Sequence, residues 1–304
     1  MSSSDTTDHQ LDWQASRLAS CLHAADALAR GKSLADSTLA SIISYPVHRL
    51  TQELQTNQIP SEVFWTQLVD LSLQVDDVSQ LVEGALDQSV KGDLIKTAVN
   101  HISTLVNEIV ADIVQHLGKI DELLKLRAGP IRQQWEARGP GMMGRIAKFS
   151  NESLVIDNAT VVLVLPALGG GGNVHPKQNC VRFEAVLTDA FGQLPETVRL
   201  AWLLTQLALI RSKQFVESAM TSSAIVNRLA ALTLAMAAAD FVELAQLNET
   251  TLNSAVESWI PSDRESASLA SITYEWWRGF AAEESPITTE IQRLDEMLRA
   301  RELA

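Results

Sequence analysis

Apolar side chains between Val99 and Leu124 recur at alternating steps of three and four residues, and this regularity constrains the fold more than any other feature. The series is Val99, Ile102, Val106, Ile109, Ile113, Leu117, Ile120 and Leu124. Such spacing keeps all of these side chains on one face of an α-helix. We therefore predict one long amphipathic helix that buries its stripe against other helices of a bundle. Self-association of two copies through the same stripe is the alternative.

Shorter helices are predicted before this stripe. Apolar periodicity and capping residues indicate helices over residues 11–31, 33–43 and 61–75, with the second one ended by Pro46. Gly129 and Pro130 interrupt the later pattern, so we place a domain boundary there. The predicted organisation is a disordered tail over 1–10, a helical bundle over 11–129 and a helix-rich α+β domain over 130–304.

Two β-strands are predicted near 160–166 and 180–187. The first contains the β-branched run Thr-Val-Val-Leu-Val-Leu, which is apolar on both faces and is expected to be covered on both sides. The second places Arg182 and Glu184 on one face, and Val181 and Phe183 on the other. Helical patterns return over 195–209, 223–247, 249–259, 263–280 and 287–303. Only 14 glycines and 9 prolines are present in 304 residues, so the predicted class is mainly α (α+β) with one small sheet.

Net charge argues against two classes of partner. Lysine and arginine total 24 against 37 acidic residues, which gives a net charge of −13. The average field therefore repels nucleic-acid phosphates and anionic membranes, and neither is expected to bind. Acidic side chains are mixed among the basic ones over 119–148, so this stretch is interpreted as a solvated helix face rather than a phosphate site. The most apolar segment, 229–239, is too short for a bilayer span, which needs about 20 apolar residues.

Cysteine usage and the first residues predict the compartment. Cys21 and Cys180 are the two cysteines, and they have no paired spacing typical of a disulfide framework. The first ten residues are polar and acidic and have no positively charged lead into an apolar run, so a secretion signal is not expected. A reducing, cytoplasmic location is therefore predicted.

The glycine run 169–172 is a candidate ligand-binding loop, because glycines let backbone amides approach an anion. Gly170, Gly171, Asn173 and Arg182 are the candidate binding residues. The run leads into a second strand rather than a helix, unlike a phosphate loop or a dinucleotide fingerprint. A flexible loop between two strands is therefore the preferred interpretation.

His175, Cys180 and Glu184 are the candidate catalytic residues, since a thiol or imidazole beside a carboxylate can support nucleophilic or acid–base chemistry. The preferred interpretation is structural, with Cys180 as a small buried side chain and an ion pair between Arg182 and Glu184. The six histidines show no metal-ligand spacing, so neither a metal site nor a cofactor is expected. Trp276 and Trp277 are adjacent on a helix, which makes one of them a candidate for an exposed contact residue.

Four segments carry a resemblance to a family of uncharacterised bacterial proteins. They are Arg138-Gly-Pro-Gly, Leu168-Gly-Gly-Gly-Gly, Asn179-Cys-Val-Arg-Phe-Glu-Ala-Val-Leu and Leu194-Pro-Glu-Thr-Val-Arg-Leu-Ala-Trp-Leu-Leu. This resemblance implies no activity. The order helix, strand, strand, helix is also similar to the core of zincin metallopeptidases, whose last helix carries His-Glu-x-x-His. The matching segment here reads Arg199-Leu-Ala-Trp-Leu-Leu-Thr-Gln-Leu and has neither the metal ligands nor the glutamate.

These observations favour a non-catalytic interaction or scaffold protein, whose partner is another protein or a second copy of the chain. Two alternatives stay open. One is a hydrolase-like enzyme that works from residues 169–184, and the other is a degenerate zincin-like pseudo-peptidase.

Overall fold

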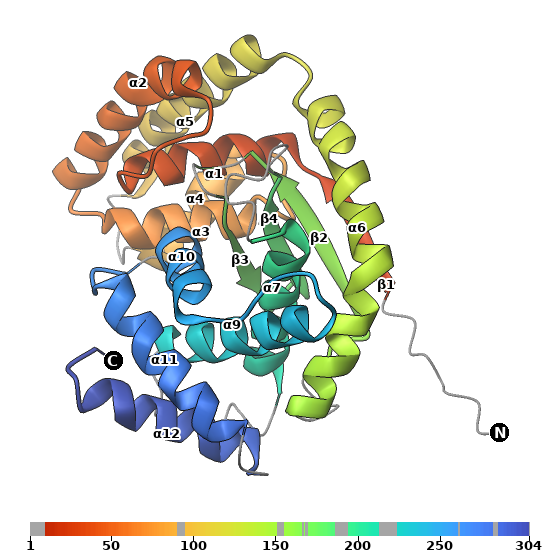
Figure 1. Ribbon diagram of the computed structural model, residues 1–304. Helices are drawn as coiled ribbons and strands as arrows, with labels where there is room; N and C mark the ends of the chain where they lie inside the picture. Colours follow the sequence, from red (N-terminus) through yellow and green to blue (C-terminus); the bar gives the residue numbers. More distant parts are fainter. Residues whose placement is uncertain are drawn as a thin grey trace. The chain divides into compact units, whose positions relative to one another are not determined.

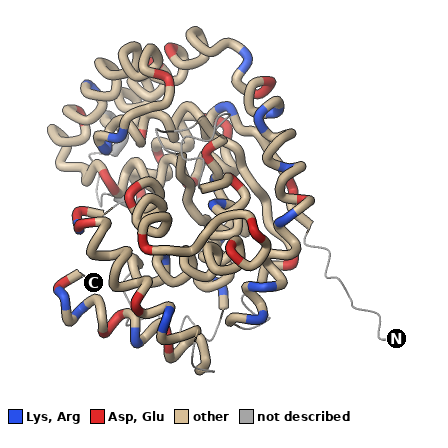
Figure 2. Tube along the Cα trace, in the orientation of Figure 1, with Lys and Arg blue, Asp and Glu red and all other residues tan. Residues whose placement is uncertain are grey.

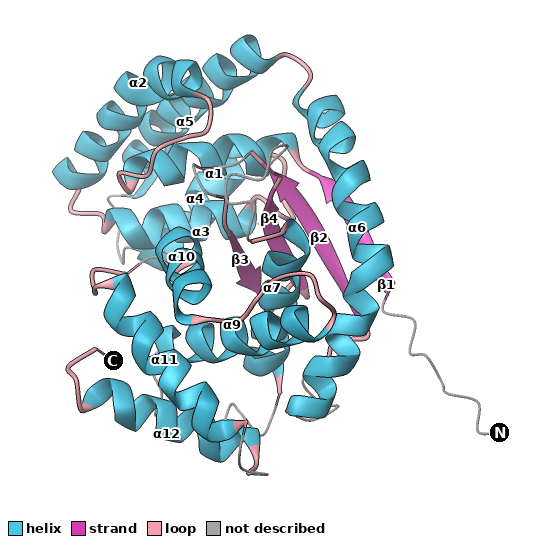
Figure 3. Cartoon of the chain, in the orientation of Figure 1, coloured by secondary structure: helices cyan, strands magenta, loops and turns pink. Residues whose placement is uncertain are grey.

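The computed structural model describes residues 10–89, 95–150, 155–165, 167, 170–185, 194–212, 224–260, 262–281 and 285–303. These ranges contain eleven helices and a small four-stranded mixed sheet, and the chain is 70% helical (Figure 1, Figure 3). The predicted class, mainly α with a small sheet, is therefore confirmed. The chain divides into two compact units, which are described separately. The helical unit comprises Gln14–Ala128 and Val162–Gly170, and the sheet unit comprises Met1–Trp13, Gly129–Val161 and Gly171–Ala304.

The helical unit is organised around the predicted amphipathic stripe. Its helices are α1 (Arg17–Ala29), α2 (Ser37–Thr56), α3 (Ser61–Leu71), α4 (Val78–Ser89) and α5 (Ile95–Leu117). Helix α5 packs against α1, α2 and α4. The stripe residues Ile102, Val106, Ile109 and Ile113 have no solvent exposure. Because the stripe is buried within one chain, it is not available as a seam between two copies.

The stripe is not one continuous helix, which corrects the prediction for residues 99–124. Helix α5 ends at Leu117, Gly118 adopts a positive φ of 61°, and a new helix, α6 (Ile120–Phe149), begins two residues later. A positive φ is sterically easy for glycine, so Gly118 can end a helix where other residues would continue it.

Gly129 and Pro130 do not interrupt the helix, because α6 continues through both residues and through Pro140, although the two compact units divide in the chain between Ala128 and Gly129. A proline deprives the carbonyl four residues earlier of its hydrogen-bond donor. Both prolines are exposed, and so are Leu126 and Glu136, which carry those carbonyls. Water can therefore replace the missing donors, and the helix survives. Along α6, acidic residues are mixed among the basic ones in the first half of the helix, and the charged residues after Glu136 are all basic (Figure 2).

Two further corrections concern the N-terminal region. Residues Gln10–Ala15 form strand β1, with alternating exposure, where a helix from residue 11 was expected. The helix starts only after Ser16, whose hydroxyl accepts a hydrogen bond from the Ala19 N–H at 3.2 Å. Pro46 does not end the second helix, because its ring lies inside α2 and the carbonyl it leaves free belongs to the partly exposed Ile42.

The remaining strands are β2 (Asn158–Val164), β3 (Gly172–His175) and β4 (Cys180–Glu184), and the spatial order is β1-β2-β4-β3. Both predicted strands therefore exist and are neighbours. All five residues of β4 and the last four of β2 are buried, as expected for strands covered on both faces. The ends of the predicted strands at residue 166 and residues 186–187 lie outside the described residues.

The helices of the sheet unit after β4 are α7 (Glu196–Arg211), α9 (Ala224–Phe241), α10 (Glu249–Trp259), α11 (Ser266–Phe280) and α12 (Ile287–Arg299). Helix α7 packs on β3 and β4 and, most extensively, on α9. Within the described residues, α9 is the one helix long and apolar enough to cross a membrane, and 67% of that segment is buried inside the fold. Such burial is typical of a core helix in a soluble protein.

Asp36 caps the N-terminus of α2 and generates the first prediction. Its carboxylate accepts a hydrogen bond from the Leu39 N–H at 2.9 Å and lies 3.1 Å from the Nε2 atom of His116. The Leu39 hydrogen bond, and secondarily His116, lower the pKa of Asp36 against the opposing effect of burial. A lowered pKa in the folded state stabilises the protein above the unfolded value of about 3.9, and this contribution is lost as the pH falls through the folded value.

We therefore expect Asp36→Ala to destabilise the protein by about 1 kcal/mol at pH 7, because a helix cap is lost. The difference from wild type is expected to shrink at about pH 2, because the carboxyl, whose pKa is lowered in the folded state, is protonated only well below its unfolded value of about 3.9. Urea unfolding at both pH values measures it. Asp36→Asn is the matched control, because it keeps a capping oxygen without the charge. An equal loss of stability for Asp36→Ala at both pH values would contradict the assignment.

Candidate functional site

The candidate residues of the 169–184 region come together on one antiparallel hairpin. In the register of β3 and β4, His175 pairs with Cys180, Asn173 with Arg182, and Gly172 with Phe183. Directly opposed residues of an antiparallel pair share one face of the sheet. Asn173, His175, Cys180, Arg182 and Glu184 therefore lie on the same face, which we call the polar face of the hairpin.

The polar face brings His175 and Cys180 together but separates both from Glu184. Cys180 and Glu184 are four residues apart on one strand, so their Cα atoms are about 13 Å apart. Proton transfer between catalytic groups requires a heavy-atom separation of about 3 Å or a bridging water. The arrangement therefore supports at most a His–Cys pair, without the carboxylate that was predicted beside it.

All four ionisable or nucleophilic side chains of the polar face are buried. The exposed fractions are 2% for His175, 3% for Cys180, 6% for Arg182 and 2% for Glu184. Asn173 is half-buried. A substrate in solution would have no direct path to these groups. Burial of this extent is typical of residues that hold a sheet in place.

The glycines of the loop are required by close packing. A Cβ atom at Gly171 would lie 2.8 Å from the Oε1 atom of Glu184, and one at Gly172 would lie 2.6 Å from the Arg182 carbonyl oxygen and 2.5 Å from the Leu203 Cδ1 atom. Gly170 has a φ of 73°, which glycine adopts without strain. The side chain of Glu184 already occupies the space beside Gly171 where an anion would have to bind. Gly169 lies outside the described residues.

The opposite face of the hairpin is covered by α7, which is fixed there by a buried arginine. Arg199 is 2% exposed, its guanidinium lies 4.3 Å from the centre of the Phe183 ring, and its Nη2 donates to the Glu184 carbonyl at 2.5 Å and to the Glu196 carboxylate. One turn further on, Trp202 stacks on Trp259 with the ring centres 5.7 Å apart. The segment of α7 that would carry metal ligands in a zincin is thus filled by packed apolar and aromatic side chains.

Within the described residues, no group of three or more His, Cys, Asp or Glu side chains could hold a metal ion. The histidines that the sequence shows to be dispersed lie in different surroundings. His101 is near Glu53 at 3.2 Å and His116 is near Asp36 at 3.1 Å, both at partly exposed positions in the helical unit.

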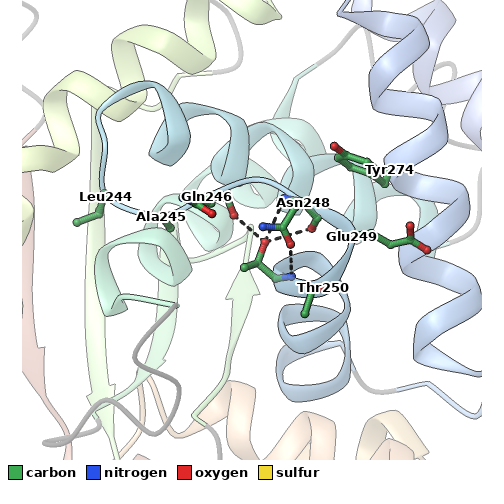
Figure 4. A pocket seen from close by; sticks show the side chains of 8 residues that line it. Leu244, Ala245, Gln246, Asn248, Glu249, Thr250 and Tyr274 are labelled. Carbon is green, nitrogen blue, oxygen red and sulfur yellow. Dashed lines mark hydrogen bonds between the residues drawn. The ribbon is translucent and has the colours of Figure 1, made fainter.

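The sequence did not indicate the concave region that the structure shows on α9, α10 and α11. One open cavity of about 700 Å³ lies at the start of α10, and a second of about 320 Å³ lies beside it. Both are lined by Tyr274 of α11, and Figure 4 shows the larger one. Asn248 and Thr251 line the larger cavity, but they already form the capping box of α10, with Thr251 N–H donating to the Asn248 Oδ1 at 2.9 Å. These polar groups of the cavity therefore already serve to cap the N-terminus of α10.

Next to the smaller cavity, an arginine is enclosed by aromatic rings. The guanidinium of Arg145 lies 4.3 Å from the centre of the Phe149 ring and 4.2 Å from that of Phe241. Phe149 in turn meets Trp277 edge to face, with 5.2 Å between ring centres. Trp277 lines the cavity together with Asp240 and Tyr274. We call these six residues, Arg145, Phe149, Asp240, Phe241, Tyr274 and Trp277, the Tyr274 surface.

The Tyr274 surface corrects the expectation for the tryptophan pair. Trp276 is 2% exposed and Trp277 is 8% exposed, so neither is a protruding contact residue. Trp276 packs inward, where its Nε1 donates to the Glu290 carbonyl at 2.8 Å. The exposed aromatic residue of this region is Phe241, at 61%. Its position at the last residue of α9, next to a charged residue, is the one sequence signal that would have indicated it.

No family model, no curated protein and no solved structure matches this chain. The resemblance to an uncharacterised bacterial family and the zincin-like order of elements therefore stay predictions.

The packing at Gly172 generates the second prediction. We expect Gly172→Ala to lower the free energy of unfolding by about 1–3 kcal/mol, because the new methyl group would overlap a backbone oxygen that cannot move freely. Gly144→Ala is the matched control, since that helical position has no atom within 4 Å of the new methyl group. The control is expected to be stabilised by about 0.5–1 kcal/mol. Thermal unfolding followed by circular dichroism measures both, and a neutral Gly172→Ala would refute the close approach.

Proposed function

We propose that this protein is a non-catalytic, cytoplasmic interaction protein and that the Tyr274 surface is where it binds another protein. One observation carries the proposal. The side chains with catalytic potential are buried in the sheet unit, whereas an arginine and aromatic rings are gathered beside an open cavity that Tyr274 and Trp277 line.

The composition of the Tyr274 surface supports binding of a protein. Arginine, tyrosine and tryptophan are the residues that most often contribute large binding energies at protein–protein interfaces. Aromatic rings supply a large contact area at a low cost in side-chain entropy. Phe241 projects into solvent beside a cavity of about 320 Å³, which combines a protruding anchor with an adjacent depression. The net charge of −13 gives no support to nucleic acid or an anionic membrane as the partner.

The alternative activity is hydrolysis by the His175–Cys180 pair, and it is favoured by their direct opposition across β3 and β4. A reactive thiol must be accessible and ionised. Burial opposes accessibility at both cysteines, and it raises the pKa of the Cys21 thiol to about 12. The pseudo-peptidase interpretation rests on the order of the elements and on the packing of α7 against β3 and β4. Both of its consequences, no metal and no hydrolysis, agree with an interaction role.

Thiol labelling tests the catalytic alternative. In a Cys21→Ala variant, Cys180 is the remaining thiol, and we expect it to react with a small disulfide reagent at least about 100-fold more slowly in the native protein than in urea, because reaction must await local opening. The absorbance of the released thiolate gives the rate. Native labelling as fast as in urea would show an accessible thiol and would favour the enzyme.

Photo-crosslinking in cells tests the interaction role. A benzophenone amino acid in place of Phe241 is expected to form covalent adducts with a protein, because this position faces the bound partner. The same amino acid at Tyr45, which is 68% exposed in the helical unit, is the matched control and is expected to give no comparable adduct. Absence of adducts at position 241, with the protein folded and expressed, would refute the proposal.

A further inference from the structure

We infer that the Tyr274 surface binds a second copy of the same chain about a two-fold axis. Phe241 of each copy enters the small cavity of the other, and Asp240 of each copy pairs with Arg145 of the other. This inference rests on the proposed function and names the partner for the same surface.

The first step of the argument is the state of Arg145. Its two faces are covered by the rings of Phe149 and Phe241, at 4.3 Å and 4.2 Å. Its Nε atom is buried and has no hydrogen-bond partner within the described residues, and no carboxylate of that part of the chain forms a salt bridge with it. A guanidinium stacked on both faces can receive a carboxylate only along its edge, where its N–H groups lie. The buried Nε atom is not accessible to another molecule, so the terminal N–H groups of Arg145 are the ones left for an acidic group from outside the chain.

The second step is that the complementary group is on the same surface. Asp240 is exposed, lines the small cavity and directly precedes Phe241. Like Arg145, it forms no salt bridge among the residues that the structure describes. An interface formed about a two-fold axis must be self-complementary, because each copy contributes the same patch. This patch contains both halves of each contact: Phe241 and the cavity that can receive it, and the cation Arg145 and the anion Asp240.

A comparison within the chain separates this surface from other exposed aromatic positions. Tyr45 on α2 is 68% exposed and also has an arginine near its ring, with Arg49 at 5.7 Å from the ring centre. However, Arg49 is already paired with both carboxylate oxygens of Glu108, at 3.0 Å and 2.9 Å. The charge of Arg49, beside Tyr45, is thus paired inside the chain, whereas the charge of Arg145, beside Phe241, is not paired in the described part of the chain. A partner protein with a charged group, acidic or basic, would therefore gain less binding energy at Tyr45.

Light scattering of the purified full chain tests the inference. Across about 1–100 μM protein, a range that covers weak to moderate dimers, we expect the mass of wild type to approach twice that of one chain. Asp240→Arg places two arginines against each other and is expected to weaken the dimer by about 100-fold or more, so that it elutes as a monomer. Glu257→Arg, the same charge change at an exposed position of α10, is the control and is expected to leave the dimer unchanged.

A second variant, Phe241→Ser, removes the anchor without changing the charge and is expected to give monomers with an unchanged near-ultraviolet circular dichroism spectrum. A monomeric wild type across the whole range, or a dimeric Asp240→Arg protein, would overturn the inference. In that case, adducts from position 241 with a different protein would leave the proposed function standing. Absence of both the dimer and the adducts would refute the inference and the proposed function together.

Discussion

The close approach of α7 to the β3–β4 hairpin is the contact on which the sheet unit depends. Leu203 comes so near to Gly172 that no side chain fits between them, and Arg199 joins the helix to the Glu184 carbonyl and to the Phe183 ring. A buried guanidinium is costly unless it is paired and hydrogen-bonded, and this one has a carboxylate, a carbonyl and a ring as neighbours. The same contact commits one face of the hairpin to packing. It thereby ties Gly172 to packing between the helix and the hairpin.

Features that depend on local sequence could be predicted well. The helical pattern over 249–259 defined α10, and the β-branched run defined β2. Errors arose where the outcome depends on solvent or on distant residues. Pro46, Pro130 and Pro140 all lie inside helices, because the carbonyls that they leave free belong to exposed or partly exposed residues. Strand β1 was missed because its short run of alternating polar and apolar residues forms a strand only when β2 is available to pair with it.

In the candidate site, too, features set by local sequence could be predicted, whereas features set by distant residues could not. Periodicity placed Arg182 and Glu184 on one face of a strand, but only the register shows that His175 joins them opposite Cys180. The Tyr274 surface draws residues from α6, α9 and α11, and Arg145 of α6 is 96 positions before Phe241 of α9 in the sequence. No spacing rule links Arg145 to Phe241, since their proximity is a property of helix packing. Sequence reasoning can nominate exposed aromatic residues, but it cannot assemble them into one surface.

The composition of α9 has a consequence for how the chain is made. With Leu229, Leu232, Leu234 and Met236 fully enclosed, this helix has no face suited to water, and its main neighbour is α7. During synthesis the hairpin emerges first, then α7, and then α9, so α9 leaves the ribosome after its main neighbour, and α10, α11 and α12, which also pack on it, follow. This order of synthesis limits the time for which α9, the most apolar helix, lacks its main packing partner. It thereby limits the chances that α9 is mistargeted or aggregates.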